Sequence, residues 1–191
     1  RVLFRSSVLA FIENHDTDRF LGEGNNLPML KQASTLLLTT RRIPQLYYGT
    51  EVMMNGVKSK SDGYVRKDFP GGWTGDATNA LTPAGRTKIQ NECYDFYKTI
   101  LNWRKGNDVI AKGSMVQFMV QNGVYAYARQ YEGKTIFVML NGTDAETTVP
   151  LKFYKEILKD SKQGKDILSG KAITFGEELK MGPRESLVIE L

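Results

Sequence analysis

The side chains best suited to chemistry lie in one short segment, residues 13–19, whose sequence is Glu-Asn-His-Asp-Thr-Asp-Arg. This segment places three carboxylates, a guanidinium and the chain's one histidine, His15, within seven residues. Groups of these types can bind polar, sugar-like substrates and, when held in place, stabilise a transition state. The simpler alternative is that His15 and Asp16 only close off a strand and bond to one another. Type and spacing alone leave both interpretations open.

The elements around this segment read as two strand–helix units. The apolar run 7–12 predicts a strand buried on both faces, as in a parallel sheet. From Pro28 onward, apolar residues recur at helical spacing, which predicts a helix. Residues 45–48 read as a second short strand. After a long glycine-rich loop, Thr82-Pro83 predicts the start of a second helix, which Gly106 ends. In a (β/α) barrel, the carboxyl ends of such strands form the active-site rim.

Beyond residue 106 the pattern changes to short strands separated by turn residues, with Asn122-Gly123 as a strong hairpin signal. Only residues 152–159 read as a helix there. The strands are expected at 114–120, 124–129, 134–140, 146–149, 171–175 and 186–191. We therefore predict an α/β part over residues 1–106 and a compact all-β sandwich over residues 107–191.

Composition excludes several classes of protein. The 191 residues are 41% hydrophobic and 25% charged, which excludes a disordered chain. The net charge of +5 is spread without a Lys/Arg block, so a nucleic-acid partner is not expected. No apolar run approaches the ~20 residues needed to span a membrane. Cys93 cannot form an internal disulfide and reads as an inert core residue, and a lone histidine gives no zinc site.

Three motifs in order resemble the α-amylase family, glycoside hydrolase family 13. Residues 11–16, Phe-Ile-Glu-Asn-His-Asp, resemble the family's F-x-x-N-H-D region at the end of the seventh barrel strand. Residues 43–51 are similar to the eighth-strand pattern G-x-P-x-x-Y-Y-G-x-E, although Arg42 stands where glycine is usual. Residues 66–76 are similar to a loop of cyclomaltodextrinase and neopullulanase-like starch-utilisation α-amylases of Bacteroidota.

The resemblance implies the last two βα units of a TIM barrel followed by a β-sandwich domain. It implies retaining cleavage of α-1,4-glucosidic bonds in starch-derived oligosaccharides, cyclodextrin or pullulan. Asp16 matches the carboxylate that stabilises the transition state, and His15 matches a donor to sugar hydroxyls. Asp62 and Arg66 are similar to a substrate-binding pair, with a loop-stabilising ion pair as the alternative. Transglycosylation in place of hydrolysis stays open.

Further expectations follow from the same resemblance. The family's nucleophilic Asp and acid Glu lie on strands four and five, which this chain does not match, so the chain alone should be inactive. Its expected partners are an α-glucan oligosaccharide and an upstream part of the same polypeptide, and an oligomer is possible. No cofactor is expected in this chain, although calcium is possible in the full-length enzyme. The location would be periplasmic or otherwise extracytoplasmic. The rival hypothesis is a non-catalytic carbohydrate-binding or structural module that keeps a barrel remnant.

Two side chains near these motifs have open roles. Trp73 could stack on a sugar face, although Pro70-Gly71-Gly72 is equally typical of a tight turn. Arg19 could line a cleft or pair with Asp18.

Overall fold

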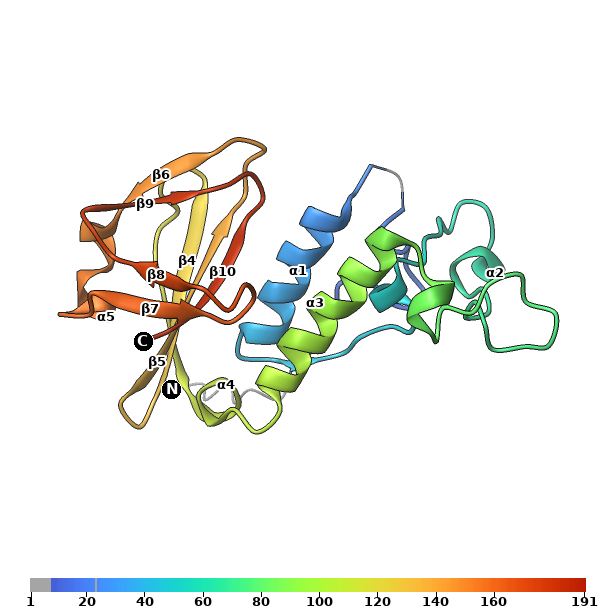
Figure 1. The fold of residues 1–191 in the computed structure, drawn as a ribbon, viewed down its shortest axis with the longest axis horizontal. Coiled ribbons are helices and arrows are strands. Elements are labelled where there is room, and N and C mark those ends of the chain that lie inside the picture. Colours follow the sequence, from blue (N-terminus) through green and yellow to red (C-terminus); the bar gives the residue numbers. More distant parts are fainter. Residues whose placement is uncertain (1–7, 23) are drawn as a thin grey trace. The chain divides into compact units, whose positions relative to one another are not determined.

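The computed structural model describes residues 8–22 and 24–191, and the chain divides into two compact units. The first unit consists of Arg1–Leu37 and Arg42–Lys98, and the second consists of Leu38–Arg41 and Thr99–Leu191. The division passes through the two long helices, α1 (Leu27–Thr39) and α3 (Lys88–Arg104), so each helix contributes residues to both units. Figure 1 traces the elements in chain order.

The first unit contains one parallel strand pair, β1 (Leu9–Ala10) and β2 (Ile43–Pro44). The Gln45 amide continues the ladder by donating to the Ala10 carbonyl at 2.8 Å. Parallel pairing brings the carboxyl ends of both strands to one edge, which is where residues 13–19 follow β1. The predicted strand–helix–strand order is thus present, but the second strand precedes the predicted range 45–48.

The expectation that the first strand is buried on both faces is wrong for the described residues. Leu9 is 53% exposed and Ile43 is 50% exposed. Among residues 8–22 and 24–191, β1 and β2 pair only with each other, so each strand has one unpaired edge. The predicted strand residue Ser7 lies outside the described residues.

Helices α1 and α3 contact each other through polar as well as apolar side chains. Within the first unit, the Ser34 and Tyr97 hydroxyls lie 2.5 Å apart, and Lys31 Nζ lies 2.6 Å from Glu92 Oε1. Burial raises the pKa of Tyr97, so its hydroxyl stays protonated and available for this hydrogen bond. These contacts join the two helices within the first unit.

Helix α3 begins later than the Thr82-Pro83 signal predicts. Thr82 caps a short 3₁₀ turn, η2 (Pro83–Gly85), because its Oγ1 accepts from the Gly85 amide at 3.3 Å. The α-helix starts at Lys88 and ends at Arg104, just before Gly106, whose φ of 77° suits a helix stop. The predicted Thr82 cap is therefore present, but it belongs to the turn before the helix.

Cys93 is fully buried, as predicted, and its Sγ donates to the Thr50 carbonyl at 3.6 Å. Burial raises the pKa of the Cys93 thiol to about 12. At about pH 8 the native protein should therefore contain roughly 10³-fold less Cys93 thiolate than the unfolded chain. We expect a chromogenic disulfide reagent to label Cys93 only after urea unfolding. Labelling of the native protein at the unfolded rate would contradict this assignment.

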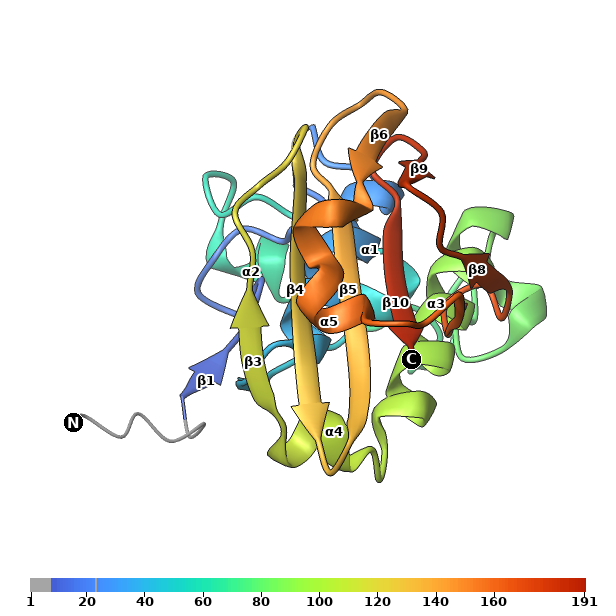
Figure 2. The ribbon, with the colours of Figure 1, turned by 90° about the vertical axis from the view of Figure 1, so that its left-hand side faces the viewer.

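The second unit is mostly β. Its main sheet has the strand order β3-β4-β5-β10-β7-β8, and β6 pairs with β9 in a second, two-stranded sheet. Figure 2 shows β3, β4, β5 and β10 side by side, with α5 lying across them. The elements are α4 (Asp108–Lys112), β3 (Ser114–Gln117), β4 (Val124–Tyr131), β5 (Lys134–Asn141), β6 (Thr147–Pro150), η3 (Leu151–Tyr154), α5 (Lys155–Leu158), β7 (Gln163–Asp166), β8 (Ala172–Thr174), β9 (Glu178–Met181) and β10 (Ser186–Glu190).

The central strands β4, β5 and β10 of the main sheet are buried on both faces. Successive side chains of a strand point to opposite faces, so each of these strands contributes to two cores. On β5, Phe137 and Met139 join the core that also contains residues of β6, β9 and α5. The alternate residues Ile136 and Val138 join a second core with Val109 of α4. The sequence pattern did not predict helix α4, which Asn107 caps by accepting from the Ile110 amide at 3.3 Å.

The predicted Asn122-Gly123 hairpin is confirmed. The turn joins β3 and β4 with φ values of 50° and 78°, the left-handed pair typical of a type I′ turn. The predicted helix 152–159 is split into η3 and α5, and strands β7 and β9 were not predicted. Within residues 8–22 and 24–191, no helix has the length and apolar character to cross a membrane.

A buried arginine joins the start of the second unit to its sheet. Arg129 is fully buried on β4 and donates to the carbonyls of Ser114, Thr39, Ile110 and Gly113 at 2.8–3.1 Å. Burial lowers the pKa of this guanidinium to about 10. The four carbonyl oxygens accept hydrogen bonds from the buried guanidinium and partly compensate for its loss of water.

Candidate functional site

The turn after β1 presents His15 and Asp16 to solvent. Asn14 Oδ1 accepts from the Asp16 amide at 2.8 Å, and Thr17 Oγ1 accepts from the Asn14 amide at 3.0 Å. Short polar side chains commonly hold such turns by bonding their own backbone. The His15 and Asp16 side chains remain 59% and 58% exposed, with His15 Nε2 3.1 Å from Asp16 Oδ2. His15 and Asp16 thus contact each other, as the simpler interpretation expects. Both side chains are nevertheless exposed enough to bind a ligand.

All four predicted site residues meet at this turn. Arg66 Nη2 lies 3.0 Å from Asp16 Oδ1 and 3.5 Å from Asp62 Oδ2, while Arg66 Nε donates to the His15 carbonyl at 2.9 Å. We call His15, Asp16, Asp62 and Arg66 the carboxylate–arginine cluster. Asp62 and Arg66 therefore form the ion pair that the alternative interpretation expected. Arg66 also contacts Asp16, which lies 46 residues before Asp62 in the chain. Such a cluster offers both donors and acceptors to vicinal hydroxyls.

Lys58 is a further member that sequence reasoning missed. Its Nζ lies 3.7 Å from Asp62 Oδ1 and donates to the Asp16 carbonyl at 3.0 Å. A signal was available, because Lys58, Asp62 and Arg66 follow one another at steps of four residues. The Lys58 amide also donates to Asp18 Oδ1, which ties the loop to the turn after β1.

The helical turn α2 (Asp62–Val65) positions Asp62 and Arg66. Ser61 caps it by accepting from the Tyr64 amide at 3.1 Å, and Arg66 is the first residue after it. The preceding loop approaches α2 closely at Gly56, where a Cβ would lie 2.6 Å from the Tyr64 carbonyl oxygen. The Gly56 carbonyl in turn accepts from the Arg19 amide at 2.9 Å. A side chain at position 56 would therefore push α2 away from the turn.

A buried ion pair supports the exposed turn. Glu13 is 2% exposed and Arg19 is 2% exposed, and Arg19 Nη1 lies 3.5 Å from Glu13 Oε1. The Glu13 carboxylate also accepts from the Phe20 amide and from the hydroxyl of Thr50, the first residue of η1 (Thr50–Val52). Both ends of the turn are thus held by one carboxylate. The suggested Arg19–Asp18 pairing is wrong, and Glu13 was not singled out from the sequence.

Arg19 also reaches the segment after β2. It donates to the Tyr48 carbonyl at 2.6 Å and to the Val65 carbonyl at 3.0 Å. Its guanidinium carbon lies 3.9 Å from the ring centre of Tyr47. Burial, reinforced by a hydrogen bond with Tyr48, raises the pKa of Tyr47. The two tyrosines therefore pack around Arg19.

Trp73 lies on an exposed turn away from these contacts. The Asp76 carboxylate accepts from the amides of Gly71 and Trp73 at 2.8 and 3.0 Å, and these bonds lower the pKa of Asp76. Trp73 is 69% exposed. The turn chemistry proposed for this segment is present, and an exposed indole on it remains free to contact a ligand.

The described residues do not assemble a metal centre. Within residues 8–22 and 24–191, no group of three or more His, Cys, Asp or Glu side chains is arranged to hold a metal ion. The carboxylate–arginine cluster contains two carboxylates that face a guanidinium, which is unsuited to a cation.

Comparison with known proteins assigns the family. A model described as the cyclo-malto-dextrinase C-terminal domain matches residues 115–190. An α-amylase of Niallia circulans is 30% identical over 176 residues, which cover 88% of this chain and 29% of the relative. A cyclomaltodextrin glucanotransferase of Thermoanaerobacterium thermosulfurigenes is 31% identical over 172 residues, covering 86% and 22%. The chain thus spans less than a third of the length of these curated relatives.

Solved structures agree on the fold. An Anoxybacillus α-amylase superimposes with a TM-score of 0.75 at 21% identity, covering 97% of this chain and 38% of that chain. The α-amylase of Geobacillus thermoleovorans gives a TM-score of 0.74 at 23% identity, covering 97% and 39%. The curated relatives are of the Bacillus type, so the expected likeness to Bacteroidota enzymes is not supported. The chain belongs to the α-amylase family, glycoside hydrolase family 13, and its residues 115–190 form a C-terminal domain of the cyclomaltodextrinase type.

Proposed function

We propose that this chain carries the seventh and eighth barrel strands and the C-terminal β-sandwich domain of a retaining α-glucan-active enzyme. In this proposal, residues 1–106 belong to the barrel and residues 107–191 to the β domain. The observation that carries it is the meeting of Asp16 with Arg66, 3.0 Å apart, at the carboxyl end of a parallel strand pair. In (β/α) barrels, catalytic residues come from this end of the strands.

The cluster suits sugar hydroxyls during bond cleavage. Asp16 accepts hydrogen bonds from hydroxyls of the sugar whose bond is cleaved and favours its distorted, oxocarbenium-like form. Arg66 holds that carboxylate in place, while His15 donates to a neighbouring hydroxyl. Asp62 and Arg66 together read a vicinal hydroxyl pair farther along the glucan. Each role is transition-state stabilisation by groups already in position rather than proton transfer.

The reacting carboxylates are expected from strands four and five of the same barrel. A retaining enzyme holds a nucleophile and an acid about 5 Å apart and forms a covalent glycosyl intermediate. Water then completes hydrolysis, or a sugar hydroxyl completes transfer. Relatives named as α-amylase and as cyclomaltodextrin glucanotransferase support both outcomes.

Exposed apolar side chains in and beside β1 and β2 support the barrel assignment. Val8, Leu9, Phe11 and Ile43 are all at least 44% exposed. Strands of a parallel barrel bury such residues on both faces, so neighbouring strands of the same polypeptide would cover them. Calcium binding, export from the cytoplasm and an oligomeric state remain expectations for the longer protein.

Two measurements test the proposal: the anomer that is released first, and whether the longer protein or the isolated chain carries out turnover. With maltodextrin, cyclodextrin and pullulan, we expect the longer protein to release products that first appear as the α-anomer in proton NMR spectra. The isolated 191-residue chain should give no turnover, because it matches neither strand four nor strand five. Release of the β-anomer, or turnover by the pure chain, would overturn the proposal. No turnover by either protein would favour the rival non-catalytic module.

A further inference from the structure

A groove in the second unit is large enough for a small ligand. It has a volume of about 530 Å³, within the range typical of small-molecule sites. Its lining residues come from three segments: residues 150–152, 155, 158 and 159 from the end of β6 through η3 and α5, residues 161 and 162 in the link to β7, and residues 175–178. Backbone hydrogen bonds join them, from Phe175 to the Lys162 carbonyl at 2.9 Å and from Leu151 to the Glu177 carbonyl at 2.8 Å. The groove is therefore preformed.

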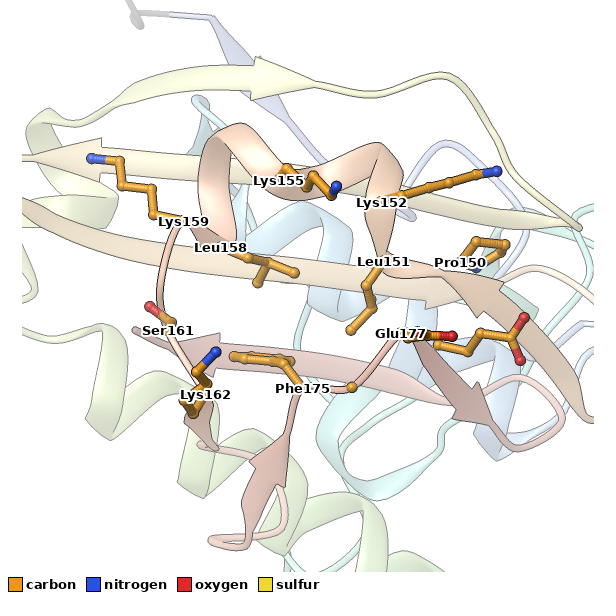
Figure 3. A pocket seen from close by; sticks show the side chains of 12 residues that line it. Pro150, Leu151, Lys152, Lys155, Leu158, Lys159, Ser161, Lys162, Phe175 and Glu177 are labelled. Carbon is orange, nitrogen blue, oxygen red and sulfur yellow. The ribbon is translucent and has the colours of Figure 1, made fainter.

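The floor of this groove is apolar. Leu151 and Leu158 are 4% and 6% exposed, and Phe175 packs partly against the same core. Figure 3 shows the Phe175 ring below Leu158 and Leu151, with all three side chains directed toward the space between the segments. An aromatic ring beside aliphatic groups offers a surface on which the C–H face of a sugar ring can pack.

Charged groups of both signs surround that floor. Figure 3 shows Lys155 and Lys159 on the α5 side, Lys162 beside Phe175, and Glu177 on the segment that leads into β9. Glu178, the first residue of β9, also lines the groove. In the part of the chain that the structure describes, no ion pair joins any of these five side chains to another group. Their hydrogen-bonding capacity is therefore free for a ligand.

The mixture of charges decides the class of ligand. A simple anion attracted by the lysines would also meet the two glutamates, and a cation would meet the lysines. A neutral ligand with many hydroxyl groups uses both, because each hydroxyl donates to a carboxylate and accepts from an ammonium group. The apolar floor accommodates its C–H faces. We propose that this groove is a second carbohydrate-binding site that holds a segment of α-glucan; only the naming of glucan rests on the proposed function.

The test is a titration of the isotope-labelled 191-residue chain with maltoheptaose, followed by amide chemical shifts. We expect saturable shifts at residues 151–162 and 175–178. The double variant Lys159→Ala/Lys162→Ala should bind about tenfold more weakly or worse. The matched control Lys165→Ala/Lys171→Ala removes two exposed lysines outside the groove and should bind normally.

A second pair of variants tests the floor. Phe175→Ala should weaken binding about tenfold or more, whereas Phe153→Ala, which removes a 45% exposed ring outside the groove, should not. Thermal melting of each variant checks its folding. If Phe175→Ala does not fold, the double variant Lys159→Ala/Lys162→Ala decides the test. Absence of saturable shifts, equal binding by variants and controls, or tighter binding of polygalacturonate at these residues would overturn the proposal. Shifts at residues 15, 16, 62 and 66 report separately on the carboxylate–arginine cluster.

Discussion

Replacing Arg19 by methionine is expected to lower the free energy of unfolding of the first unit by about 3–5 kcal/mol. Arg19 and Glu13 are both 2% exposed, so the substitution leaves a carboxylate buried beside Thr50 without its cation. It also removes the donors to the Tyr48 and Val65 carbonyls. A methionine fills much of the volume but satisfies none of these groups.

The matched control is Arg66→Met. Arg66 also contacts carboxylates, but its side chain is 41% exposed, so its loss should cost less than about 1 kcal/mol of stability. Hydrogen exchange of amides in the first unit, measured under increasing urea, reports both changes. Equal effects of the two substitutions would show that the Glu13–Arg19 pair does not support the turn that carries His15 and Asp16.

The exposed half of the site could be predicted from the sequence, whereas its buried support could not. His15 and Asp16 follow β1 directly, and Asp62 and Arg66 lie one helical turn apart, so local spacing was sufficient to select them. Glu13 pairs with Arg19 because the intervening turn reverses the chain, and this geometry is not visible in the spacing. The adjacent Asp18 offered a nearer acid, which instead accepts from the Lys58 amide.

The same distinction applies to the fold. Asn122-Gly123 specifies its turn locally, and the continuous apolar run at residues 136–140 of β5 is typical of a strand buried on both faces. Strand β7, Gln163–Asp166, contains no β-branched or aromatic residue and forms only because it pairs with β10 and β8. Pairing likewise determines the length of β1, which pairs only with β2 among the described residues.

Asp16→Asn in the longer protein is the second substitution with a large expected effect. We expect kcat on maltodextrin to fall by about 10²- to 10³-fold, the range for losing one preorganised transition-state contact. The neutral amide keeps the shape of the side chain but loses the charge that favours the oxocarbenium-like sugar. Stability should barely change, because Asp16 is 58% exposed and its partner Arg66 is 41% exposed.

Asp108→Asn is the control for this measurement. Asp108 is 56% exposed and lies 3.0 Å from Lys112 Nζ, which closely matches the exposure of Asp16 and its 3.0 Å distance to Arg66. The central claim is that the carboxylate–arginine cluster stabilises the transition state of glucan cleavage. It predicts that kcat collapses in Asp16→Asn and is retained in Asp108→Asn, with melting temperatures alike. An Asp16→Asn enzyme with the kcat of the unmodified protein would contradict it.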